Sequence, residues 1–148
     1  MNQRLVIGIG NEFRRDDAVG LIVLRRLRER NLPLVTLAES SGEGTQLMDL
    51  WKDASEVILV DAISSGRKAG SIQRFEAHRQ ALPAQTFRYS THAFSLGEAI
   101  ELARAMNQLP PSVIVYGIEG KDFGAGVGLT QEVEEAVEAV LERILIDL

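Results

Sequence analysis

The segment from Glu56 to Ile63, EVILVDAI, constrains the fold of this chain more than any other. It is a short, nearly continuous apolar run rich in β-branched residues, without the polar–apolar alternation that marks a half-exposed strand. Such runs are typical of strands covered on both faces, as in parallel sheets. The chain must therefore supply helices for both sides of a sheet.

The rest of the chain alternates between apolar strands and amphipathic helices. We expect strands over residues 4–10, 34–38, 56–63, 71–75 and 112–118, and helices over 17–30, 44–52, 95–107 and from 130 onward. This order predicts an α/β fold, a three-layer α/β/α sandwich with a mostly parallel, about five-stranded twisted sheet. The segment 71–75 is the candidate edge strand. Residues 1–148 contain no linker or repeat and are expected to form a single domain.

Helix boundaries are marked by capping residues. Ser95 and Glu98 form the S-x-x-E pattern of a capping box, and Thr130 is a suitable N-cap for the last helix. Asp16 or Asp17 is a candidate cap for the first helix, because short acids are favoured there. If one member of that pair is a cap, the other is still free for another role.

Composition excludes several classes of protein. The chain has no cysteine, so disulfides, thiolate metal ligands and a cysteine nucleophile are impossible. The first residues lack the features of a signal peptide, and no apolar run approaches the roughly 18 residues of a membrane span. We therefore expect a cytoplasmic protein without a membrane partner. The net charge of −5 argues against nucleic acid. The run RRLRER at 25–30 is expected to be the solvated face of a helix.

Polar residues follow several of the expected strands. In open α/β sheets, ligands bind beyond the carboxyl ends of the strands. Asp17 lies in the segment after the first strand, Asp61 ends the third, and His92 lies shortly before the helix at Ser95. The segment Glu39-Ser40-Ser41-Gly42 ends the second strand. We therefore expect all of these groups along one edge of the sheet.

Two carboxylates and one imidazole are hard and borderline ligands. They suit Zn²⁺, Ni²⁺, Mn²⁺ or Fe²⁺ better than Cu⁺, which prefers sulfur. The position of Asp61 at the end of an apolar run favours a functional role over a structural cap. A carboxylate there loses solvation unless it has a partner. His92 gains significance only from its convergence with the acids. The other histidine, His78, is expected to be exposed. The residues predict a divalent-metal site of Asp17, Asp61 and His92.

Other sites fit the sequence less well. Gly8-x-Gly10-Asn11 resembles half of a dinucleotide fingerprint, but Phe13 stands where the third glycine belongs, and two acids at the helix opening would repel a pyrophosphate. The chain has no P-loop, no H-E-x-x-H and no G-x-S-x-G. We therefore interpret Gly8-x-Gly10-Asn11 as the glycine-containing end of a strand followed by a tight turn.

Residues 8–20, GIGNEFRRDDAVG, resemble the opening motif of the hydrogenase maturation endopeptidases, G-x-G-N-x4-D-[DE]-x-x-G. Val60-Asp61-Ala62 and Ser90-Thr91-His92 are similar to that family's second and third motifs. Gly117-Ile118-Glu119 and the segment 126–130, GVGLT, fit in order and spacing. The resemblance covers nearly the whole chain.

This resemblance implies a five-stranded α/β/α fold and a peptidase that removes the C-terminal extension of a nickel–iron hydrogenase large-subunit precursor after nickel insertion. It implies that Asp17, Asp61 and His92 bind the metal. The Ni²⁺ is expected to arrive with the precursor and to signal that loading is complete, and Zn²⁺ or Cd²⁺ are expected to act as surrogates. The motifs assign no nucleophile. We expect a monomer.

One departure from the family concerns the second strand, which in the family commonly ends in D-G-G. This chain has Glu39-Ser40-Ser41-Gly42 there, and we expect that segment to contact the substrate. Two other functions stay open: a non-catalytic chaperone that recognises metal-loaded protein, and a nucleotide- or nucleoside-binding enzyme of similar fold. The fold alone does not choose among the three.

Overall fold

The computed structural model describes residues 3–83, 86 and 92–148. In chain order its elements are β1 (Arg4–Ile9), the 3-10 turn η1 (Arg15–Ala18), α1 (Val19–Arg28), β2 (Val35–Ser40), α2 (Gly44–Trp51), β3 (Glu56–Ile63), β4 (Ile72–Glu76), α3 (Leu96–Ala105), β5 (Ser112–Glu119) and α4 (Gln131–Asp147). The predicted order of elements is confirmed. Strand β2 runs further than expected, so Glu39 and Ser40 belong to the strand itself.

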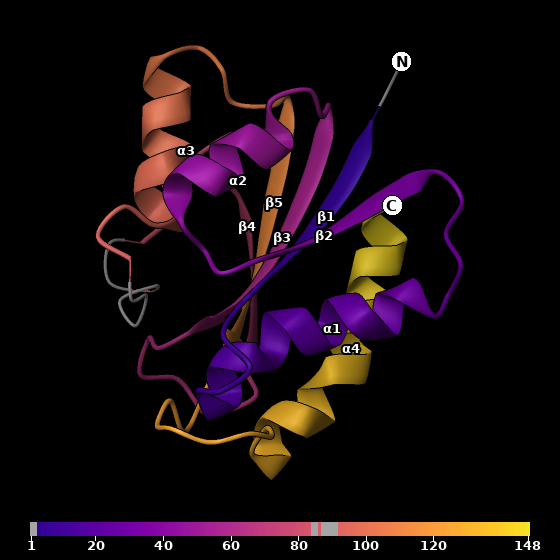
Figure 1. Cartoon of the computed structure of the whole chain (residues 1–148), viewed down its shortest axis with the longest axis vertical. Coiled ribbons are helices and arrows are strands. Elements are labelled where there is room, and N and C mark those ends of the chain that lie inside the picture. The colour runs from indigo at the N-terminus through magenta and orange to yellow at the C-terminus, as the bar shows by residue number, and fades with distance from the viewer. Residues whose placement is uncertain (1–2, 84–85, 87–91) are drawn as a thin grey trace.

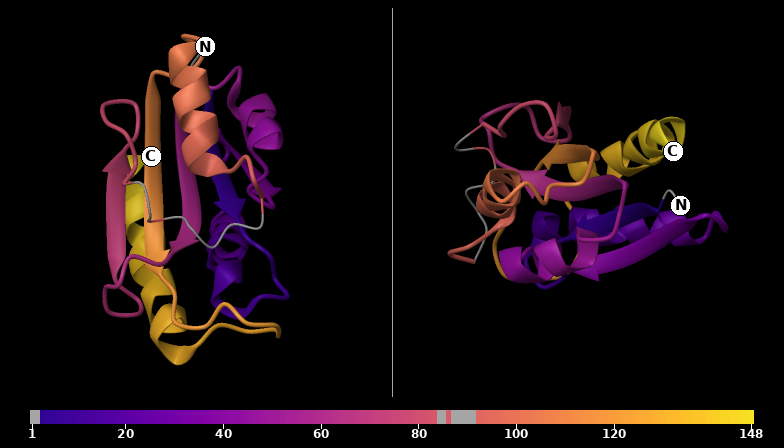
Figure 2. Two further views of the ribbon diagram at one scale, coloured as in Figure 1. Left: turned by 90° about the vertical axis from the view of Figure 1, so that its left-hand side faces the viewer. Right: turned by 90° about the horizontal axis from the view of Figure 1, so that it is seen from above.

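The strands form one five-stranded sheet in the order β2-β1-β3-β5-β4. All neighbours are parallel except β4, which pairs antiparallel with β5 at the edge. Helices α1 and α4 lie on one side of the sheet and α2 and α3 on the other (Figure 1). The side view in Figure 2 shows β4 at the margin beside β5, as the short strand at 71–75 predicted. The three-layer architecture is therefore confirmed.

Each side of the sheet has its own hydrophobic core, and the alternation of side chains along β1 divides them. Val6 packs with α1 and α4, in a core that includes Val23 and Val137. Leu5 and Ile7 point the other way, toward the core under α2 and α3. A strand that is buried on both faces explains the continuous apolar run that the sequence shows.

Glycines bring α1 directly onto the sheet. A Cβ atom on Gly20 would lie 2.2 Å from the carbonyl oxygen of Ile9 and 2.3 Å from that of Val60. A Cβ atom on Gly8 would lie 2.3 Å from the carbonyl oxygen of Gly20. These glycines therefore serve close helix–sheet packing, which fixes the start of α1 beside the ends of β1 and β3.

One local expectation is wrong, and two expected N-caps are confirmed in position but not in the hydrogen bonds of their side chains. His78 is partly buried rather than exposed, because its Nδ1 lies 3.0 Å from the backbone nitrogen of Val113. Ser95 is the N-cap of α3, but its hydroxyl donates to the Glu98 carboxylate instead of capping the backbone. Thr130 is the N-cap of α4, yet its side chain does not cap the helix either.

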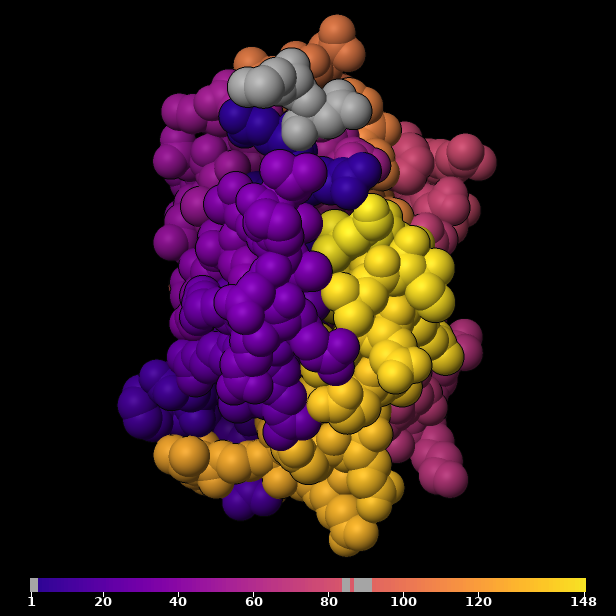
Figure 3. All heavy atoms as spheres, turned by 90° about the vertical axis from the view of Figure 1, so that its right-hand side faces the viewer, coloured from indigo at the N-terminus to yellow at the C-terminus, as the bar shows by residue number. Residues whose placement is uncertain are grey.

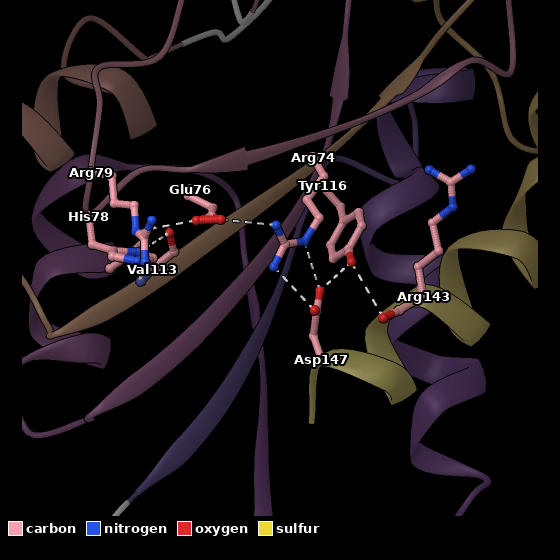
Figure 4. Close-up of polar contacts among 8 residues, drawn as sticks. All are labelled: Arg74, Glu76, His78, Arg79, Val113, Tyr116, Arg143 and Asp147. Atoms are coloured by element: carbon pink, nitrogen blue, oxygen red, sulfur yellow. Dashed lines mark hydrogen bonds and ion pairs between the residues drawn. The ribbon is translucent and has the colours of Figure 1, made fainter.

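A polar network fastens the end of α4 to the sheet (Figure 4). Two guanidinium nitrogens of Arg74 on β4 donate to the carboxylate of Asp147, at 3.1 and 3.2 Å. The buried Tyr116 of β5 donates its hydroxyl hydrogen to the same carboxylate.

Within the described residues, no helix is long and apolar enough to cross a membrane.

Candidate functional site

A cavity of 480 Å³ opens at the carboxyl ends of the central strands. Its lining includes all the residues that the sequence singled out: Asp17, Asp61, His92, Glu39, Ser40, Ser41 and Gly42. The predicted convergence of these groups along one edge of the sheet is therefore confirmed. Parallel strands deliver their carboxyl ends to a common edge, and this brings together residues far apart in the sequence.

The adjacent acids Asp16 and Asp17 have different roles. Asp16 is fully buried, and its carboxylate accepts hydrogen bonds from the backbone N–H groups of Lys121, Asp122 and Thr130 at 2.8–2.9 Å. The Thr130 hydroxyl donates to it as well. Asp16 is thus the structural member of the pair. The sequence suggested that Asp16 could cap α1, but it instead holds the loop between β5 and α4.

Asp17 faces the cavity, with 16% of its side chain exposed. Its Oδ2 accepts a hydrogen bond from the backbone N–H of Asn11 at 3.1 Å and lies 4.0 Å from the guanidinium of Arg14. Burial raises the pKa of Asp17, and the charges of Arg14 and His92 and the Asn11 hydrogen bond offset only part of that rise. Asp17 and His92 line the same cavity, so the imidazole and this carboxylate share one space.

Asp61 lies within β3, two residues before its last residue, rather than at its end as expected, and its side chain lines the cavity. Its Oδ1 accepts a hydrogen bond from the backbone N–H of Ala62 at 2.8 Å. Burial raises the pKa of Asp61 well above its usual value, and the negative charge of Asp17 raises it further. The two carboxylates therefore repel each other across the site, as like charges in a poorly solvated cavity must.

His92 lines the same cavity from the segment before α3. Its ring lies near the chain after β2, since a Cβ atom on Gly42 would be 4.0 Å from the His92 Cδ2. Ser90 and Thr91, the other residues of the third motif, lie outside the described residues. Within residues 3–83, 86 and 92–148, no three His, Cys, Asp or Glu side chains are placed so that they could hold a metal ion together. The ligand set Asp17, Asp61 and His92 stays a prediction.

The donors present nonetheless fit a divalent cation in kind. Two carboxylates and an imidazole face one cavity, and the raised pKa of Asp61 shows that its negative charge lacks sufficient compensation. A cation between them would remove the repulsion that Asp17 and Asp61 exert on each other. Oxygen and nitrogen donors of this kind match nickel, zinc and related ions.

Arg25 is a cavity residue that the sequence did not reveal. Two of its guanidinium nitrogens donate to the carboxylate of Glu39, each at 3.1 Å, and a third lies 3.5 Å from Glu12. Hydrogen bonds from Arg25 lower the pKa of Glu39. Arg25 is on the solvated face of α1, as expected, but it also reaches the cavity lining. Asp17, Leu21 and Arg25 all line the cavity, and their four-residue spacing was the available signal.

The chain after β2 is tied down locally. The buried Ser40 accepts a hydrogen bond from the backbone N–H of Gly42 at 3.0 Å and donates to the side chain of Gln46 at 2.8 Å. Gly42 has a φ of 95°, a conformation that glycine adopts without strain. The segment therefore turns sharply from the sheet into α2 while keeping its backbone against the cavity.

The chain is similar to known proteins over nearly its whole length. A family model described as hydrogenase maturation protease matches residues 23–147. The hydrogenase 2 maturation protease of Escherichia coli strain K12 is 25% identical over 143 residues, which cover 95% of this chain and 87% of that protein.

Solved structures share the fold of this chain. The hydrogenase maturating endopeptidase HybD from E. coli superposes with a TM-score of 0.78 at 24% identity, covering 100% of this chain and 92% of that one. The NiFe hydrogenase maturation protease HycI from Thermococcus kodakarensis KOD1 superposes with a TM-score of 0.71 at 27% identity, covering 96% of this chain and 90% of that one.

Proposed function

The chain belongs to the hydrogenase maturation protease family and is a hydrolase of the endopeptidase kind, and on that premise we propose what it cleaves and how it recognises it. The substrate is the precursor of a nickel–iron hydrogenase large subunit, from which the enzyme removes a C-terminal extension. The nickel already held by the precursor is the recognition signal. It is contacted by Asp17, Asp61 and His92.

One observation carries the proposal. Asp17, Asp61 and His92 line a single cavity of 480 Å³ together with the end of β2. That volume is within the range of sites that enclose a small ligand, so it accepts a short stretch of polypeptide. A segment that carries a metal would present it to oxygen donors from η1 and β3 and to a nitrogen donor from the segment before α3.

The electrostatics of the site favour a substrate that brings positive charge. Asp61 resists ionisation because it is buried and because Asp17 is negative. A metal-free segment leaves that repulsion in place. A metal-loaded segment offsets it, and both carboxylates then ionise at a lower pH and act as ligands. The bound metal supplies Lewis acidity, while the residues of this chain orient it.

The required discrimination is small in energy. A hundredfold preference for loaded over unloaded precursor needs only about 2.8 kcal/mol, since each 1.4 kcal/mol is a factor of ten. One additional ligand bond, together with relief of the carboxylate repulsion, is of that order. Arg25 and Glu39, paired at the rim, present charged groups to the flanking residues of the substrate.

Incubation of purified precursor with the enzyme, followed by mass spectrometry, tests the proposal. We expect trimming of nickel-loaded precursor and little or none of the metal-free form. His92→Ala should abolish cleavage of both forms. Asp49→Asn is the matched control, because Asp49 is an exposed carboxylate that pairs with Lys52 away from the cavity.

Three outcomes would contradict parts of the proposal. Efficient trimming of metal-free precursor under strict chelation would remove the nickel signal. Binding of loaded precursor without cleavage would favour the non-catalytic chaperone. Stabilisation by nucleotides in a thermal-shift screen would favour a nucleotide- or nucleoside-binding enzyme. Against that function, Gly8 and Gly20 already serve the packing of α1 on the sheet.

A further inference from the structure

We propose that Phe13 and Val127 form an apolar docking patch beside the cavity, which binds an apolar surface of the folded precursor outside its cleaved segment. The inference rests on the proposed function and adds a second recognition surface to it. Both side chains are large, apolar and exposed, with 64% of Phe13 and 73% of Val127 accessible.

Single exposed apolar residues are common and need no explanation. These two differ because backbone hydrogen bonds join their loops, although the residues lie far apart in the sequence. The N–H of Gly126 donates to the carbonyl oxygen of Phe13 at 2.9 Å, and the N–H of Arg15 donates to that of Gly126 at 3.1 Å. In Figure 3 the two segments, indigo and orange, protrude side by side from one corner.

The patch stands on a fixed backbone. Asp16 accepts backbone hydrogen bonds from Lys121 and Thr130, at the two ends of the loop that carries Val127. Gly126, with a φ of 141°, lies against Arg15, whose Cδ would be 2.9 Å from a Cβ atom there. Side chains held on a rigid backbone lose less conformational entropy on binding, which favours their use as anchors.

The patch continues the catalytic cavity. Phe13 lines the cavity as well as being exposed, whereas Val127 lies beyond it. A polypeptide that occupies the cavity therefore meets the patch as it leaves. The cavity encloses only a short segment, so recognition of a folded precursor requires contacts outside it. Aromatic and aliphatic anchors at the centre of a contact carry most of the binding energy in protein interfaces.

A second copy of this chain is a less suitable occupant. Stable dimers bury at least about 1,200 Å² of total surface. Two side chains on paired loops supply a small part of that area, which suits a transient contact with a substrate. The precursor is also the partner that must approach this edge of the sheet, because the cavity is there.

Kinetics on folded, nickel-loaded precursor test the patch. Val127→Ser should raise KM about five- to tenfold with kcat unchanged, because a docking contact is made equally in the ground and transition states. Phe13→Ser should raise KM at least tenfold. Leu34→Ser and Ile146→Ser are matched controls: these side chains are 81% and 84% exposed and lie outside the cavity lining. Each control should change KM less than twofold.

The outcomes separate this inference from the proposed function. If the wild type cleaves precursor and Val127→Ser has the KM of the controls, the patch is wrong and the function stands. If the wild type binds without cleaving, the same comparison is made on Kd. If the wild type neither binds nor cleaves, both proposals fail. A wild-type dimer that Val127→Ser makes monomeric in analytical ultracentrifugation would assign the patch to self-association and overturn the inference.

Discussion

Two carboxylates, Asp61 on β3 and Asp147 at the end of α4, experience opposite environments. Asp61, at the cavity, has a strongly raised pKa because of burial and the charge of Asp17. Asp147, at the end of α4, is also penalised by burial, but hydrogen bonds from Arg74 and Tyr116 and the charge of Arg74 bring its pKa below the usual value. Asp61 is thus held at an energetic cost. Asp147 instead has Arg74 and Tyr116 as partners, as Figure 4 shows. The cavity is therefore organised for binding and the α4 network for stability.

The largest expected effect follows from removing the charge at the cavity. Asp61→Asn should lower kcat/KM for nickel-loaded precursor at least a thousandfold, which corresponds to about 4 kcal/mol of transition-state stabilisation. The protein without metal should be as stable as the wild type or slightly more so, because the repulsion with Asp17 is gone. Parallel measurements of cleavage and urea denaturation check this. A large loss of stability would instead make Asp61 a structural residue.

Asp16 and Asp17 allow the same comparison between adjacent residues. Asp16→Ala leaves three backbone N–H groups of the loop between β5 and α4 without their acceptor. These hydrogen bonds are only partly buried, so each loss lies toward the low end of the roughly 1–3 kcal/mol range, and we expect about 3–5 kcal/mol less free energy of unfolding in total. Asp17→Ala should cost stability little and abolish processing. Equal effects of the two substitutions on stability would contradict the division of roles.

Asp147→Asn should destabilise the protein by about 1–3 kcal/mol at pH 7, because it weakens the charge-assisted hydrogen bonds from Arg74. Because the pKa of Asp147 is lower in the folded protein, its ionised carboxylate adds stability at pH values above the pKa of the unfolded chain. This contribution is lost as the pH falls through the folded pKa. The difference between variant and wild type should therefore shrink below about pH 3.8.

The pH dependence of stability that Asp61 causes should have the opposite sign. Its folded pKa is raised, so the wild type loses stability relative to Asp61→Asn as pH rises above about 3.8 toward the folded pKa. Denaturation midpoints of the wild type and both variants between pH 3 and 7 provide the measurement. Curves that differ by a constant at every pH would mean that neither carboxylate is coupled to folding as described.

The sequence predicted what depends on local pattern and strand direction. Asp61 could be placed because it is the one acid inside an apolar run, close to its end, and the parallel order then put Asp17 and His92 at the same edge. The partners of Asp16 could not be found, since Lys121 and Thr130 come from the far end of the chain and show no local signature. Arg25 was missed because a charged run on a helix was treated as uniformly solvated.

The α4 network was hidden for the same reason. Nothing near Tyr116 in the sequence indicates that its hydroxyl reaches Asp147, because tertiary packing alone brings β5 and α4 together. The antiparallel pairing of β4, which supplies Arg74, is likewise a property of the sheet rather than of the strand. Long-range hydrogen bonds of buried polar groups are thus the part of this structure that sequence patterns leave open.

The smallest expected effect comes from the tyrosine of that network. Tyr116→Phe keeps the buried ring and removes one donor to Asp147, while Arg74 still holds the carboxylate, so we expect a loss of about 1 kcal/mol at pH 8. Burial and the charge of Asp147 raise the pKa of Tyr116 to about 12. The unfolded chain ionises near pH 10, so wild-type stability should fall between pH 10 and 12 while the phenylalanine variant lacks this loss. Stability curves that stay parallel from pH 8 to 11 would show that the hydroxyl is not held by the carboxylate.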